Sequence, residues 1–510
     1  MLDTSFFGKY FRASLLVILL VELLSFLVYW LRLIVDLNSA IFLIITAFVF
    51  ILSLIKLEYG LYAAILELFI GSQGHLFNLT INNYSIGIRI GIFCAVMLAW
   101  TIKFIFEKNI HDRYHEHLKS FFVKQKSLFI LGAVAVWGII FALIRHNSLS
   151  NIFFDFNAWL YFLYLLPMLG VFYHKEQFDK IIQILTAAIA AIAAKSLIFL
   201  YVFSHNLPMA ELFYKWGRDS RWGEFTPAGQ NLYRIFSQAQ IFALLGFFIV
   251  IGYLIFKGRM NYRSPKNQYL AIIAFSALTA VLISLSRSFW LAMFVSILLL
   301  LAFAIFKEKI SAKDFLIAVF RLIFIGVMGY GLIACVVNFP YPNLGRVVDP
   351  SQMLLGRASG DAAVSSRWSE LPNLLKAIAK HPLVGSGWGA TVTYVSQDPR
   401  IKNILNPTGA YTTYAFEWGY LDIILKIGLI GLAAYLAVIW SIFADLKNIW
   451  KQNEDRFFRA LLLGFAFALI ALLVTHAFSP YLNHPLGIGF IILLFIYIRT
   501  YSTRQTAINA

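Results

Sequence analysis

The feature that most constrains this chain is its series of long apolar stretches, separated by short polar connections. A helix that spans a bilayer needs about 20 mostly apolar residues, and fourteen stretches are candidates. Only 13% of the residues are charged, against roughly 25% in soluble domains. The sequence therefore excludes a water-soluble enzyme and predicts an all-α polytopic membrane protein with 12–14 transmembrane helices. The candidates are residues 13–31, 37–55, 59–72, 86–106, 127–145, 158–173, 180–203, 234–256, 269–286, 288–306, 314–336, 417–441, 458–477 and 484–500. The third and sixth are short and could be tilted, broken or partly re-entrant.

Basic residues are distributed unevenly between the two sides of the predicted bundle. Of the 42 Lys and Arg residues, 24 fall in alternate connections counted from the N-terminus, and such an excess marks the cytoplasmic side of a membrane protein. We therefore expect both termini to be cytoplasmic. The net charge of +17 is spread over these short clusters, so it does not indicate a nucleic-acid-binding surface.

Two longer segments fall on the opposite, outer side. A smaller loop covers residues 204–233, and a large loop covers residues 337–416. The expected order is helices 1–11 within residues 1–336, then the large extracytoplasmic loop, then helices 12–14 within residues 417–510. Inside the large loop, Ser369 could cap a helix over residues 370–380 with Pro372 in its first turn. Leu371, Leu374, Leu375 and Ile378 would form one apolar stripe, which predicts a partly helical lid on the membrane surface.

Three arginines on the predicted outer face could bind an anion. Arg287 lies in the sequence Ser-Leu-Ser-Arg-Ser at the tip of a tight helical hairpin, Arg234 opens the eighth helix, and Arg367 precedes the lid helix. A guanidinium group binds phosphate oxygens in a planar, bidentate geometry. The structural alternative is an arginine that extends its charge to the membrane interface or into solvent.

The large loop and its C-terminal end carry two further candidates. Gly385, Gly387 and Gly389 alternate in a segment that could bring flexible backbone close to a ligand. No strand is expected before them, so a dinucleotide-binding loop is rejected. Glu417 lies at the N-terminus of the twelfth helix beside Tyr420, where the helix macrodipole alone favours a carboxylate. A general base that deprotonates a sugar hydroxyl would have the same surroundings, and both interpretations stay open.

Other polar residues have simpler explanations. Asp422 and Lys426 have the i,i+4 spacing of a local ion pair. Ionisable residues at membrane depth are costly and call for partners; they also include Glu22, Glu67, Arg89, Lys195 and Arg321. His111, His115 and His117 fall in a lysine-rich loop typical of solvent, and His476 and His484 are weaker candidates for a base. No Asp-x-Asp pair lies in an outer loop, and Cys94 and Cys335 are isolated in apolar runs, so no metal site is expected.

The order of these motifs resembles that of the O-antigen ligase and O-antigen polymerase family of bacterial membrane glycosyltransferases. The match consists of Arg234, the hairpin Ser286–Arg287, then Arg367 followed by Pro-Leu-x-Gly-x-Gly, and finally Tyr-Leu followed by Gly-x-x-Gly. It covers about residues 230–440. One departure concerns the base: the family commonly has His-Asn where this chain has Glu417 and Trp418.

The resemblance implies an enzyme of the bacterial cytoplasmic membrane. Its donor would be a glycan on polyprenyl diphosphate at the outer face, and its acceptor a glycan or lipid-linked glycan, with inversion at the anomeric carbon and neither metal nor other cofactor. Arg234 and Arg287 would bind the diphosphate, with Arg367, Tyr420, Gly385 and Gly387 completing the substrate site. Either Glu417 replaces the family histidine as base, or the base lies elsewhere and the chain is a divergent branch of the family. Ligase and polymerase stay open. A secondary transporter or flippase is the alternative, although the expected paired repeats and midplane site are not evident.

Overall fold

The computed structural model describes residues 6–32, 37–81, 84–107, 121, 123–228, 232–256, 265–339, 362–396, 401, 406, 408–452, 454 and 456–508. Within these ranges, ten helical segments are long and apolar enough to cross a membrane, and three shorter apolar helices accompany them. The predicted all-α polytopic class is therefore confirmed. The ten are α1 (Lys9–Leu31), α2 (Asn38–Ile55), α4 (Ile88–Phe106), α6 (Lys126–Ile144), the segment Leu149–Val171, α9 (Lys175–Ser204), α13 (Arg287–Phe306), α14 (Ala312–Asn338), α17 (Gly419–Gln452) and α18 (Arg456–His476).

The shorter apolar segments are α11 (Gln240–Phe256), Asn267–Ile283 within α12 (Pro265–Ile283), and Pro485–Thr500 within α19 (Pro485–Ile508). Helix α3 (Leu57–Ile70) joins them in the core. Of the tilted, broken or partly re-entrant forms expected for the short sixth span, the structure shows a broken one. Residues Leu149–Val171 form α7 (Leu149–Phe156), a 3₁₀ stretch η1 (Asn157–Tyr164) and α8 (Leu165–Val171). Side chains on every face of α11 are buried, and its Gly252 lies against Gly464 of α18. Small residues allow two membrane helices to approach closely.

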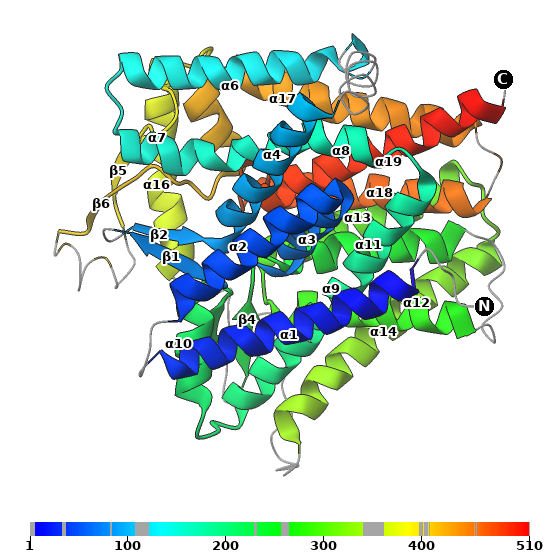
Figure 1. The fold of residues 1–510 in the computed structure, drawn as a ribbon. Coiled ribbons are helices and arrows are strands. Elements are labelled where there is room, and N and C mark those ends of the chain that lie inside the picture. Colours follow the sequence, from blue (N-terminus) through cyan, green and yellow to red (C-terminus); the bar gives the residue numbers. More distant parts are fainter. Residues whose placement is uncertain are drawn as a thin grey trace.

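Three short hairpins, not predicted from the sequence, lie at one end of the bundle with the helices α10 (Ala210–Asp219) and α16 (Ala362–Lys380) (Figure 1). They pair β1 (Asn78–Ile81) with β2 (Tyr84–Gly87), β3 (Glu224–Pro227) with β4 (Tyr233–Phe236), and β5 (Val392–Val395) with β6 (Ala410–Thr413). Four residues per strand are too few for a clear periodic pattern. The start of α1 and the end of α19 lie at the opposite end of the bundle (Figure 1). We call the end that carries the hairpins the α16 end.

The helix in the large loop is longer than predicted. It spans Ala362–Lys380, so Ser369 is not its cap and Pro372 lies in its interior rather than in its first turn. The side chain of Leu375 is 48% exposed, whereas Glu370 and Leu374 are buried. Proline lacks the N–H group that a helix interior needs. In the turn of α16 that precedes Pro372, the carbonyl of Arg367 accepts a bond from the indole nitrogen of Trp418 (3.2 Å). This bond joins α16 to the residues just before α17.

Helix α17 is interrupted at Gly428, whose φ of 71° and ψ of −177° are not helical. The loop after α16 bonds to the backbone on both sides of the break. The amides of Ser386 and Gly387 donate to the carbonyls of Leu425 (2.6 Å) and Lys426 (3.0 Å). Beyond the break, the amides of Leu429 and Ile430 donate to the carbonyls of Pro382 (2.9 Å) and Leu383 (3.1 Å). Irregular backbone inside a membrane protein requires internal partners of this kind.

Candidate functional site

A tight turn between α12 and α13 carries Arg287, as the sequence predicts. Three residues, Ser284, Leu285 and Ser286, connect the helices, and Arg287 is the exposed first residue of α13. The turn is held by its serines: the amide of Ser286 donates to Ser284 Oγ (3.2 Å), and Ser286 Oγ bonds Ser288 Oγ (3.1 Å). The guanidinium thus stands at a helix N-terminus, where backbone N–H groups and the macrodipole also favour an anion.

Arg234 lies beside this turn, but not where the sequence placed it. It belongs to strand β4 rather than to the start of a span, because the β3–β4 hairpin precedes α11, which begins at Gln240. Its Nε donates to the carbonyl of Ser284 (3.1 Å), and its Nη1 lies 3.2 Å from a carboxylate oxygen of Glu224. Arg218 approaches the other oxygen of Glu224 at 4.0 Å. The structure thus brings Arg234 to the Arg287 hairpin through Ser284.

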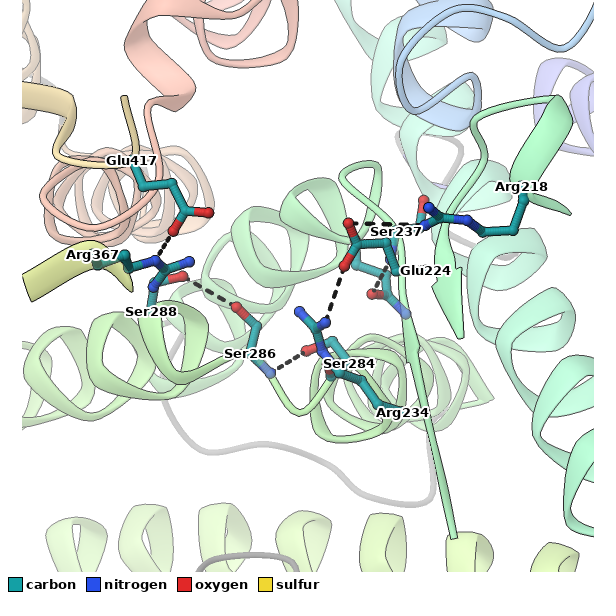
Figure 2. Close-up of polar contacts among 10 residues, drawn as sticks. Arg218, Glu224, Arg234, Ser237, Ser284, Ser286, Ser288, Arg367 and Glu417 are labelled. Carbon is teal, nitrogen blue, oxygen red and sulfur yellow. Dashed lines mark hydrogen bonds and ion pairs between the residues drawn. The ribbon is translucent and has the colours of Figure 1, made fainter. Parts of the chain in front are cut away.

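Arg367 and Glu417 form an ion pair on the other side of the serine turn (Figure 2). Arg367 lies within α16, and not ahead of the lid helix as predicted. Glu417 stands two residues before α17, close to the helix N-terminus expected for it. Both side chains are partly open to solvent, with 37% and 50% of their surfaces exposed. The base predicted from the sequence is therefore the partner of a predicted substrate-binding arginine.

A chain of contacts connects the two sides of the site. Ser288 Oγ bonds Ser479 Oγ (3.1 Å) in the turn after α18. The neighbouring Phe478 packs against Trp418, with 5.7 Å between ring centroids, and Trp418 bonds Arg367 in α16. The ends of α13, α16, α17 and α18 therefore converge with β4 at the α16 end. Ser479 was not recognised in the sequence, because nothing local marks it as a neighbour of Ser288.

The other predicted substrate residues occupy structural positions. The Tyr420 hydroxyl donates to the carbonyl of Leu473 (2.9 Å) in α18. Gly385 and Gly387 have φ angles of 79° and 82°, a region that favours glycine. A Cβ on Gly385 would come within 2.6 Å of the Ile427 amide, and one on Gly387 within 2.5 Å of the Ala142 amide. These glycines allow the loop to pack against α17 and α6.

A buried cluster of charges involves α17, the helix that follows Glu417. The predicted local pair of Lys426 with Asp422 is confirmed at 2.6 Å, and Lys426 also bonds Asp155 from α7. Asp422 accepts a bond from the amide group of Asn483 (2.6 Å), and Asp155 accepts one from the Gly389 amide (2.8 Å). Asp155 was missed because its partners lie far along the chain. The sequence signal was an acid within an apolar run.

Glu370 of α16 is a second carboxylate that the sequence analysis missed. Its side chain is only 4% exposed, and among the described residues Oε1 has no hydrogen-bond partner. Burial and the nearby charge of Asp422 raise the pKa of the Glu370 carboxyl to about 7, although Arg367 opposes this shift. A buried carboxylate without a counter-ion is costly in its ionised form. The sequence could have indicated Glu370 by its helical spacing, three residues after Arg367 and four before Leu374, which places the three side chains on one face of a helix.

The remaining ionisable candidates have structural partners or lie elsewhere. Glu22 pairs with Lys195 (2.6 Å) and Glu67 with Arg89 (2.8 Å). Nδ1 of His476 accepts from the Leu482 amide (3.1 Å), and Nδ1 of His484 accepts from the Leu486 amide (3.3 Å). His111, His115 and His117 lie outside the described residues. No group of three potential metal ligands occurs in the described part of the chain, and Cys94 and Cys335 are free thiols.

Most of these site residues fall in one segment that is similar to known proteins. Residues 271–436 match the O-antigen ligase family. The resemblance predicted from the motifs is thus confirmed over the segment from α12 to α17. A ComP-specific O-oligosaccharyltransferase of Acinetobacter baylyi (strain ATCC 33305 / BD413 / ADP1) is 29% identical over 190 residues. That alignment covers 36% of this chain and spans 31% of the relative.

Proposed function

We propose that the protein is a membrane glycan transferase of the O-antigen ligase type, which takes its glycan from a polyprenyl-diphosphate donor. The observation that carries the proposal is the meeting of Arg234 with the Arg287 hairpin through Ser284. The family match over residues 271–436 supports the same class of activity. Two guanidinium groups, one at a helix N-terminus, are suited to the two phosphates of a lipid diphosphate.

The reaction needs little beyond these groups. An acceptor hydroxyl attacks the anomeric carbon, the bond from that carbon to the diphosphate oxygen breaks, and the hydroxyl proton passes to a carboxylate. The diphosphate leaves with the electron pair, and its additional charge is stabilised by Arg234 and Arg287. A single displacement inverts the anomeric carbon. We place the site at the outer face of the bacterial cytoplasmic membrane, with residues 337–416 as the extracytoplasmic loop and both termini cytoplasmic.

The proposal is tested by reconstituting the purified protein with a polyprenyl-diphosphate oligosaccharide in the presence of a chelator. We expect polyprenyl diphosphate to be released together with a glycosylated product, measured by mass spectrometry. A ladder of longer lipid-linked glycans indicates a polymerase, and release only after a separate glycan, lipid-glycan or protein acceptor is added indicates a ligase. A protein acceptor is included because the relative is named an O-oligosaccharyltransferase. An unchanged donor in all arms contradicts the proposal and favours a transporter.

Glu224 supplies a smaller prediction about donor binding. The half-exposed carboxylate of Glu224 forms an ion pair with Nη1 of Arg234. A diphosphate that binds Arg234 must compete with this carboxylate. Exposed ion pairs contribute about 0.2–1 kcal/mol, so Glu224→Gln is expected to tighten binding of glycan-free polyprenyl diphosphate by about 1.5- to 5-fold. Calorimetric titration in detergent measures this. The control is Glu211→Gln, an exposed acid of α10 that pairs with Lys215. Weaker binding by Glu224→Gln than by the control would show that Glu224 orients Arg234 instead.

A further inference from the structure

The site contains two carboxylates that could receive the acceptor's proton, and their surroundings differ. Glu417 is half-exposed and ion-paired with Arg367. A guanidinium partner stabilises the ionised form of a carboxylate and weakens it as a base. Glu370 lies on α16 one turn beyond Arg367, so the two side chains share a face of the helix. It is buried, and its Oε1 has no partner among the described residues.

The charges around Glu370 favour the uptake of a proton. Asp155 and Asp422 flank one ammonium group, that of Lys426, so the two carboxylates already outnumber the cation. Their oxygens also accept bonds from Gly389 and Asn483. Glu370 adds a third carboxylate close to Asp422, with Arg367 as the opposing charge on its own helix. Asp155 and Asp422 both contact the Lys426 ammonium and accept hydrogen bonds, contacts that favour the ionised form of a carboxylate. Oε1 of Glu370 has no such partner among the described residues, so Glu370 is the member of the cluster best suited to take up a proton.

We propose that Glu370 accepts the proton of the attacking acceptor hydroxyl, and that Glu417 instead positions Arg367. This inference rests on the proposed glycan transfer. In the step, the acceptor's O–H bond breaks as its oxygen bonds the anomeric carbon. The proton passes to the Glu370 carboxylate, through at most one water, while the diphosphate leaves with the electron pair of its own bond. Glu370 then releases the proton to solvent before the next cycle.

The first test measures kcat/KM against pH for the wild type, Glu370→Gln, Glu417→Gln and the control Glu211→Gln. A base must be deprotonated to act, so with a pKa of about 7 the wild-type rate should fall tenfold per pH unit below that value. Removing a general base costs typically 10²–10⁴-fold. We expect Glu370→Gln to lose about 100-fold and to lose this acid limb, while Glu417→Gln keeps the limb and raises KM. An unaltered limb in Glu370→Gln, or its loss in Glu417→Gln, would overturn the inference.

A second measurement does not depend on activity. The pKa of Glu370 is raised from its ordinary 4.5 to about 7, so the folded wild type holds a proton that the unfolded chain releases within this range. Wild-type stability therefore decreases as pH rises from about 4.5 to 7, whereas glutamine has no charge to bury. The thermal midpoint of Glu370→Gln minus that of the wild type should increase over this range and then level off. A constant difference would contradict the inference.

These two readouts separate the possible failures. If the wild type transfers no glycan, the proposed function fails, and the stability measurement still reports on Glu370. If the wild type is active and Glu370→Gln retains its rate and pH profile, only the inference about Glu370 fails. Should Glu370→Gln not fold, Glu370→Asp replaces it. The shorter side chain keeps the carboxylate but retracts it, so a reduced rate that retains an acid limb supports the proposal, and a wild-type rate contradicts it.

Discussion

Arg287→Lys is expected to lower glycan transfer about 1,000-fold while the protein remains folded. The substitution keeps the positive charge but replaces five donors in a planar fork with a single ammonium group. Arg287 is the exposed first residue of α13, so it can reach a diphosphate beside the serine turn. Losing one donor aimed at the developing charge of a transition state costs about 10²–10³-fold in rate. Initial rates of polyprenyl diphosphate release measure the effect.

The matched control for this substitution is Arg32→Lys. Arg32 follows α1 and pairs with Asp219 at the end of α10, with about half of each side chain exposed. It therefore lies at the α16 end but outside the convergence of β4, α13 and α16. Arg32→Lys should keep the wild-type rate. If Arg287→Lys is as active as this control, Arg287 is an interfacial charge and the diphosphate must be bound elsewhere.

The sequence predicts the parts of the site that depend on polar residues lying close together in the chain. Ser-Leu-Ser-Arg between two apolar runs predicts the hairpin of Arg287, and a pair of ionisable residues spaced i,i+4 predicts the contact of Asp422 with Lys426. Both depend on neighbouring residues, and the structure confirms both. Arg234 was misplaced by the same reasoning, because a four-residue strand directly before an apolar helix reads as the beginning of that helix.

Contacts between distant segments could not be predicted in this way. Lys426 appeared to be satisfied by Asp422, and nothing in the sequence shows that Asp155 approaches it from α7. The alternating glycines suggested a backbone that is open to a ligand. In the fold, the Gly385–Gly387 turn instead bonds the backbone of α17. The Pro-Leu-x-Gly-x-Gly and Gly-x-x-Gly motifs are therefore two halves of one structural unit.

Gly428→Ala is expected to be strongly destabilising, because this unit depends on a glycine at the break in α17. The φ of 71° and ψ of −177° at Gly428 fall in a region essentially restricted to glycine, where other residues cost about 1–3 kcal/mol. A Cβ would also overlap the Leu383 carbonyl and come within 2.5 Å of the Val384 amide. Backbone cannot rotate away as a side chain can, so we expect a total loss of at least about 3 kcal/mol. Thermal unfolding in detergent measures the loss.

Gly132→Ala in α6 is the control, since no heavy atom lies within 4 Å of a Cβ at that position. Alanine is the better helix former by about 1 kcal/mol, so this variant should be as stable as the wild type or more so.

The Gly428→Ala variant also reports on the site. Asp422 and Lys426 lie in the part of α17 before the break, and Gly389 bonds Asp155 from the same loop. If Gly428→Ala unfolds only locally, hydrogen exchange should increase in residues 382–390 and 419–430 and transfer should be lost. A variant with wild-type thermal stability, exchange and transfer would show that α17 can do without its break, and the link between the two motifs would then have no structural basis.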